Sequence, residues 1–171
     1  PANNKSMNAS DPQPPVNEEY AGYAAAAKAF RTGKLAEAAA LAESFVSTAA
    51  KDAANKGVEF AGYELKNPVC KSTDLDAITK KLDAYSAYAT YVEEVATLVR
   101  NANKNGYETK YVTVVNEILE ANQAELADHF RNVESVNILK ARLEAAVSAM
   151  KKSALTKAAD NTHVADLLIP T

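Results

Sequence analysis

Apolar residues in the middle of the chain recur at alternating spacings of three and four. Between Ser72 and Lys104 there is no proline or glycine, and the stripe consists of Leu75, Ile78, Leu82, Tyr85, Ala89, Val92, Ala96 and Val99. Residues three and four apart lie on one face of an α-helix, so the stripe predicts a single helix. A helix of about 30 residues is about 45 Å long, and a seven-residue repeat is typical of coiled-coil packing.

The region before this stripe predicts a shorter helical hairpin. Its first helix runs from Asn17 to Arg31, and its second runs from Leu35 to about Lys56. We expect the turn at Thr32–Lys34, with Gly33 in the left-handed conformation that ends many helices. The apolar segment 58–65 fits either a continuation of the second helix or an irregular segment. The Asn67-Pro68 pair ends it, because the residue before a proline avoids the helical conformation.

The second half of the chain predicts another long helix. Asn105-Gly106 is a helix stop, and an apolar stripe then continues from about Tyr107 to about Ala159. Because residues 131–135 contain neither proline nor glycine, we predict one helix of about 50 residues with a bend. The alternative is a break at 132–135, with Ser135 as the N-cap of a new helix.

Together these segments predict the fold class and the domains. The class is all-α: an elongated antiparallel helical bundle with two very long helices and a shorter N-terminal helical hairpin. Residues 17–171 form a single helical-bundle domain, alanine-rich and without tryptophan, in a chain of 171 residues. Residues 1–16 are polar and proline-rich without an apolar period, which predicts a disordered tail.

Three positions are candidates for covalent modification. Asn4 and Asn8 each begin a triplet that fits the N-glycosylation acceptor pattern, as expected of a glycoprotein. Cys70 is the single cysteine, so an internal disulfide is excluded. We expect a free thiol there, or an intermolecular disulfide if the protein is secreted.

Charge and motifs argue against several classes of function. The net charge is −3 and the basic residues are scattered, whereas a nucleic-acid-binding protein needs a basic face. The five glycines are isolated, so the sequence contains no phosphate-binding loop, and neither histidine lies near Cys70 in the sequence. We therefore predict no enzyme, no cofactor, no small-molecule substrate and no nucleic-acid partner.

Two clusters of residues are candidate sites. Glu125 and His129 are four apart, with Asp128 between them, so both side chains could reach one metal ion on a helix face. A chain with two histidines cannot supply the two Glu-x-x-His pairs of a di-iron bundle, so we predict no metal site. The tyrosines at 85, 88 and 91 are either a wide core face or an aromatic contact surface for another chain.

The segment from Ala29 to Ala38 is similar to the turn of a tetratricopeptide unit. It combines Phe30, Gly33, Leu35 and Ala38 at the spacing of a close helical hairpin. A repeat array needs further copies about 34 residues apart, and no second copy is found near residue 64. The motif therefore predicts a general helical hairpin.

The alanine-rich runs 23–30, 35–42 and 75–99 carry a resemblance to a known family. In composition and helical pattern they are similar to the alanine-rich surface coat proteins of trypanosomes, such as the glutamic acid/alanine-rich protein. The resemblance covers residues 17–169. It implies an elongated helical bundle that stands on the cell membrane through a C-terminal lipid (GPI) anchor outside this chain.

We therefore expect a non-enzymatic coat or structural protein at the cell surface or outside the cell. It would shield a membrane or present its tip loops to protein partners or to copies of itself. The alternative is a cytoplasmic helical adaptor that binds partner peptides or helices in a groove around Tyr23, Ala27, Leu35 and Ala42. A third hypothesis is a small-ligand carrier with a pocket in the bundle.

Overall fold

The computed structural model describes the backbone of residues 18–67 and 74–168 and the side chains of residues 22–67 and 74–155. These parts of the chain are helical apart from short connections and contain no strand, which confirms the all-α class. The predicted tail, Asn4, Asn8 and Cys70 lie outside the described residues. The elements in chain order are α1 (Glu18–Phe30), the π-helical segment η2 (Arg31–Leu35), α2 (Ala36–Ser44), α3 (Thr48–Leu65), α4 (Asp74–Arg100), α5 (Ala102–Asn105), α6 (Thr109–Asp128) and α7 (Val133–Leu168).

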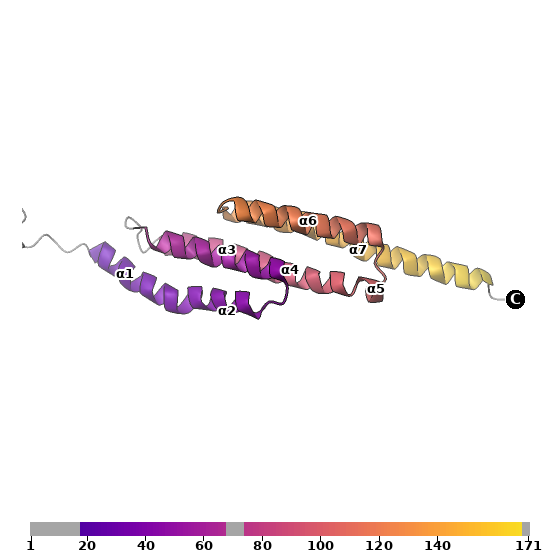
Figure 1. Cartoon of the computed structure of the whole chain (residues 1–171), viewed down its shortest axis with the longest axis horizontal. Helices are drawn as coiled ribbons and strands as arrows, with labels where there is room; N and C mark the ends of the chain where they lie inside the picture. The colour runs from indigo at the N-terminus through magenta and orange to yellow at the C-terminus, as the bar shows by residue number, and fades with distance from the viewer. Residues whose placement is uncertain (1–17, 68–73, 169–171) are drawn as a thin grey trace, which may run out of the picture.

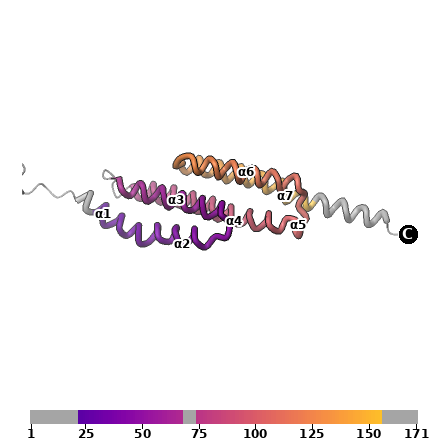
Figure 2. The backbone as a smooth tube through the Cα atoms, in the orientation of Figure 1, coloured from indigo at the N-terminus to yellow at the C-terminus, as the bar shows by residue number. Residues whose placement is uncertain are grey.

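The longer helices lie along one common axis, and the chain runs back and forth along it (Figure 1). α4 lies at the centre of the arrangement, because it packs against α3 on one side and against α7 on the other. α6 packs mainly against α7 and approaches α3 less extensively. The α6–α7 hairpin is shifted along the axis relative to α3, so α3 and α6 overlap over only part of their length (Figure 2).

The central helix agrees with the sequence prediction. α4 buries the predicted stripe positions Ile78, Leu82, Tyr85, Ala89 and Val92. The single turn of α5 follows it and ends at Gly106, whose φ of 74° is left-handed. This confirms the predicted helix stop, because glycine adopts that conformation without the steric cost of a Cβ atom.

The predicted N-terminal hairpin turn is wrong. The helix continues through Gly33, which lies in η2, and the Thr32 hydroxyl donates to carbonyl oxygens of the preceding turn. The tetratricopeptide-like segment is therefore not a hairpin. The chain reverses at 45–47 instead, where Phe45 is extended and the Ser47 side chain caps α3 by accepting from the Ala50 N–H. The open segment 58–65 is helical and completes α3.

The prediction of one helix from Tyr107 to Ala159 is also wrong. The alternative of a break is confirmed, but the break lies at 129–132 and not at 132–135. α6 ends at Asp128, and α7 begins at Val133 and packs back against α6. The cap of α7 is Asn132 and not Ser135, because the Ser135 N–H donates to the Asn132 side-chain oxygen at 2.8 Å. A capping asparagine ends and restarts a helix without any glycine or proline.

The core consists of two clusters along the axis. One joins α1, α2, α3 and the start of α4 and includes Tyr23, Ala27, Phe30, Phe60, Leu65 and Leu82. The other joins α2, α3, α4, α6 and α7 and includes Tyr85, Tyr88, Val95, Val115, Leu143 and Met150. Between them α3 comes very close to α4, since a Cβ atom on Gly57 would lie 2.6 Å from the Tyr85 Cβ atom.

Candidate functional site

A groove of about 260 Å³ lies between α3, α4 and α6. Its apolar lining comes from all three helices and consists of Ala49, Ala53, Tyr88, Val92, Leu119 and Leu126. Its polar rim consists of Asp52, Lys56, Glu59 and Gln123. For scale, an apolar protein cavity of about 150 Å³ holds a benzene molecule.

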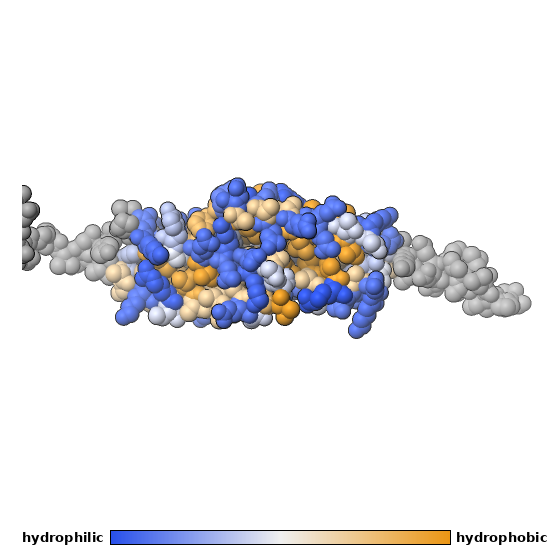
Figure 3. Space-filling model, viewed as in Figure 1, coloured by the Kyte–Doolittle hydropathy of each residue, from blue (hydrophilic) through white to orange (hydrophobic). Residues whose placement is uncertain are grey.

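The groove exists because α3 carries small side chains where it faces α6. Ala49 and Ala53 are four residues apart, so they share a helix face and leave room that a larger residue would fill. The face of α3 that meets α4 is packed more closely, through Gly57. The space-filling view shows apolar residues between polar ones over α3 and α6, with a hollow near the centre of this face (Figure 3).

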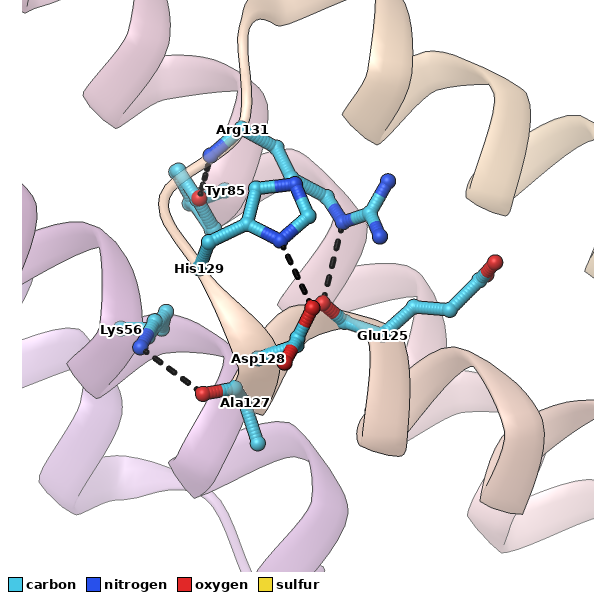
Figure 4. Close-up of polar contacts among 7 residues, drawn as sticks. All are labelled: Lys56, Tyr85, Glu125, Ala127, Asp128, His129 and Arg131. Atoms are coloured by element: carbon cyan, nitrogen blue, oxygen red, sulfur yellow. Dashed lines mark hydrogen bonds and ion pairs between the residues drawn. The ribbon is translucent and has the colours of Figure 1, made fainter.

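Two polar contacts span the mouth of the groove from α3 to α6. The Gln123 side-chain amide donates to the Asp52 carboxylate at 2.8 Å. The Lys56 ammonium donates to the Ala127 carbonyl at 3.4 Å (Figure 4). The same ammonium lies 4.8 Å from the centre of the Phe130 ring. Lys56 is therefore directed to the C-terminal end of α6, where free carbonyl groups favour a cation.

The Glu59 carboxylate is different from its neighbours on the rim. It forms no hydrogen bond or ion pair with any residue in the described part of the chain, and it is exposed. The rim carries two carboxylates and one ammonium group, and the ammonium is already bound to α6. The groove is therefore negatively charged at its mouth.

The tyrosine of the lining connects the groove to a buried polar contact. The Asn122 amide nitrogen donates to the Tyr88 hydroxyl and to the Leu139 carbonyl, both at 3.0 Å. Burial raises the pKa of Tyr88 to about 12, because its phenolate form would lose solvation. The Asn122 side-chain oxygen is buried and has no hydrogen-bond partner among the described residues.

The metal candidates of the sequence are not brought together. The Glu125 carboxylate pairs with Arg142 at 2.9 Å and points away from His129, while the His129 ring meets the neighbouring Asp128 carboxylate at 3.0 Å (Figure 4). His129 and Asp128 are both exposed. No group of three or more potential metal ligands was found in the described ranges.

The tyrosines of α4 belong mainly to the core. Tyr85 and Tyr88 are buried, which supports the wide core face over a contact surface at these two positions. Tyr91 is half-buried, and Lys140 lies 5.8 Å from the centre of its ring.

The surface predicted for an adaptor is largely buried. Tyr23 and Ala27 line a small pocket between α1 and the C-terminal end of α3, whereas Ala42 is buried in the other core cluster. The groove between α3, α4 and α6 is separate from this pocket, and the sequence analysis did not find it. Its signal was the spacing of Asp52, Lys56 and Glu59, which places three charges on one face beside two alanines.

The chain was compared with family models, curated proteins and solved structures. No family model, no curated protein and no solved structure matched the chain. Among the described helices, none has an apolar stretch long enough to cross a membrane.

Proposed function

We propose that this protein is a non-enzymatic structural protein of the cell surface, in which a helical rod holds its end loops away from the membrane. The observation that carries this proposal is the alignment of the longer helices along one axis (Figure 1). Helices that share an axis confine irregular backbone to the turns between them, although the α2–α3 and α6–α7 turns lie part-way along the rod (Figure 1). Binding residues are most often found in such irregular backbone.

The packing supports a stiff rod. α4 extends through both core clusters and packs against a helix on each side. The buried side chain of Tyr85 on α4 also contacts the α6–α7 connection. The Tyr85 hydroxyl accepts from the Arg131 N–H of that connection at 2.8 Å (Figure 4). Contacts of this kind join the helices before α4 and the α6–α7 hairpin to one central helix. Bending the rod would therefore disrupt the core.

The direction of the chain suggests an orientation for the rod. α7 points to one end, and the C-terminal end of α3 and the start of α4 lie towards the other (Figure 1). We propose that the α7 end faces the membrane through a lipid anchor, and that the connections after Leu65 and after Asp128 are presented outward. Those loops would contact protein partners or other copies of the chain.

The test is to stain cells that express the natural protein with antibodies raised against the folded chain. We expect staining of intact cells, removal of the signal by surface protease, and epitopes that include the connection at 129–132. An antibody against a cytosolic protein serves as the control and should stain permeabilised cells only. Staining that requires permeabilisation would place the protein inside the cell and overturn the proposal.

A further inference from the structure

We propose that the groove between α3, α4 and α6 binds a small molecule with an apolar body and a cationic amine. This site goes beyond the proposed structural role and does not depend on it. The argument combines the size and lining of the groove with the charges at its mouth.

The apolar body is indicated by the lining. The groove has room for more than the benzene-sized occupant that an apolar cavity of about 150 Å³ holds. Ala53, Val92 and Leu126 are buried at its base. A single ring or a short alkyl chain there would remove apolar surface from water, which is favourable in proportion to the area covered.

The amine is indicated by the rim. Glu59 has no partner in the described part of the chain, whereas Lys56 already donates to the Ala127 carbonyl. The α6 side of the groove is formed by the last turns of that helix, and the partial negative charge of its C-terminus is already met by Lys56. A ligand ammonium group at the mouth would meet the Glu59 carboxylate, while a ligand carboxylate would be repelled by it.

The groove is also held in a way that allows a ligand to enter. Across its mouth α3 and α6 are joined by the Asp52–Gln123 contact and the Lys56–Ala127 contact, both of which are exposed. Exposed polar contacts contribute little to stability and exchange readily with water. An incoming ligand therefore displaces solvent and side-chain hydrogen bonds without opening the core.

The experiment measures binding to the full-length, isotope-labelled chain by changes in backbone amide NMR shifts. The probes are 2-phenylethylamine, the neutral 2-phenylethanol and the anionic 3-phenylpropanoate, which share the same apolar body. We expect the amine to saturate at about millimolar concentration or below and to bind at least about tenfold more tightly than the carboxylate. The shift changes should centre on the residues of α3 and α6 around Ala49 and Gln123.

Two variants test the location and the charge. Ala49→Leu fills the mouth of the groove from a half-buried position and should weaken amine binding at least about tenfold. Glu59→Gln changes an exposed side chain and should weaken amine binding about five- to tenfold while leaving the alcohol unaffected. The matched controls are Ala39→Leu on α2 and Glu117→Gln on α6, neither of which lines the groove, and both should bind like the wild type.

Several results would overturn the proposal. They are the absence of any saturable shift, shifts outside the groove, undiminished binding by Ala49→Leu, and equal affinity for the amine and the carboxylate. If Ala49→Leu changes the amide shifts of residues 1–16 in the ligand-free chain, the groove holds the N-terminal segment of the protein itself. That result would also overturn the proposal.

Discussion

Gly57 is the point at which the close approach of two helices can be tested by adding a single methyl group. A Cβ atom at this position would lie 2.6 Å from Cβ of Tyr85, 3.1 Å from its Cγ and 3.4 Å from Cδ1 of Leu82. Carbon atoms prefer separations of about 3.5–4.0 Å, so Gly57→Ala requires a shift of about 1 Å. The Tyr85 Cβ atom is attached directly to the α4 backbone, so the two helices themselves must move apart.

The expected magnitude follows from two opposing terms. Alanine favours a helix over glycine by about 1 kcal/mol, and overpacking a well-packed core costs about 1–3 kcal/mol. Because the contact is with Cβ and not with the flexible end of a side chain, we place Gly57→Ala at the upper end of that cost. The net loss of unfolding free energy is then about 1–2 kcal/mol, or a lower Tm by about 2–8 °C for a chain of this size.

Gly62 supplies a matched control on the same helix. An added Cβ atom there meets nothing within 4 Å, and its φ is not positive. Gly62→Ala should therefore raise the unfolding free energy by about 0.5–1 kcal/mol. Urea denaturation followed by far-UV circular dichroism measures both variants, and the reasoning is refuted if Gly57→Ala is as stable as Gly62→Ala.

Three further outcomes are expected. Gly106→Ala should cost about 1 kcal/mol, because a Cβ atom is strained at the positive φ of this helix stop, and an unchanged Tm would contradict this. Asn122→Ala should cost about 1–3 kcal/mol in urea denaturation, since it removes two buried hydrogen bonds, to the Tyr88 hydroxyl and to the Leu139 carbonyl. The hydrogen bond from the Val46 N–H, together with that from the Ser47 N–H, lowers the pKa of Glu93. The ionised Glu93 side chain therefore stabilises the folded state above the unfolded pKa of about 4.3, and this stabilisation is lost as the pH falls through the native pKa. The urea midpoints of the wild type and Glu93→Gln should therefore differ at pH 6 and converge towards pH 3, and a constant difference would sink this explanation.

The parts of the fold that could be predicted from sequence are those with local causes. The stripe of α4 follows from spacing alone, and the stop at Gly106 follows from the conformational freedom of glycine. The same rule failed at Gly33, because an isolated glycine permits a turn without requiring one. There the helix absorbs an extra residue as the π-helical segment η2, and Arg31 donates to the Leu65 carbonyl on α3.

The groove could not be predicted, because it depends on distance between helices and not on residue type. Ala49 and Ala53 resemble Ala50 and Ala54 in the sequence, yet only the first pair lines the groove, although Ala53 is as buried as the second pair. The distance between α6 and α3 decides which of these alanines line the groove. That separation follows from the packing of α6 against α7, which no pattern within α3 records.

Two chain reversals, one that the sequence did not predict and one that it left as the alternative, are fixed by side chains of α4. At 45–47, the Glu93 carboxylate accepts from the N–H groups of Val46 at 2.6 Å and Ser47 at 2.8 Å. In the α6–α7 connection, the Tyr85 hydroxyl accepts from the Arg131 N–H at 2.8 Å. Backbone N–H groups that leave a helix need acceptors, and here the acceptors lie 46 and 47 residues away in sequence. The central helix α4 therefore packs against its neighbours and also fixes the residues at which they end. Because its side chains supply these acceptors, both segments turn without a glycine or a proline.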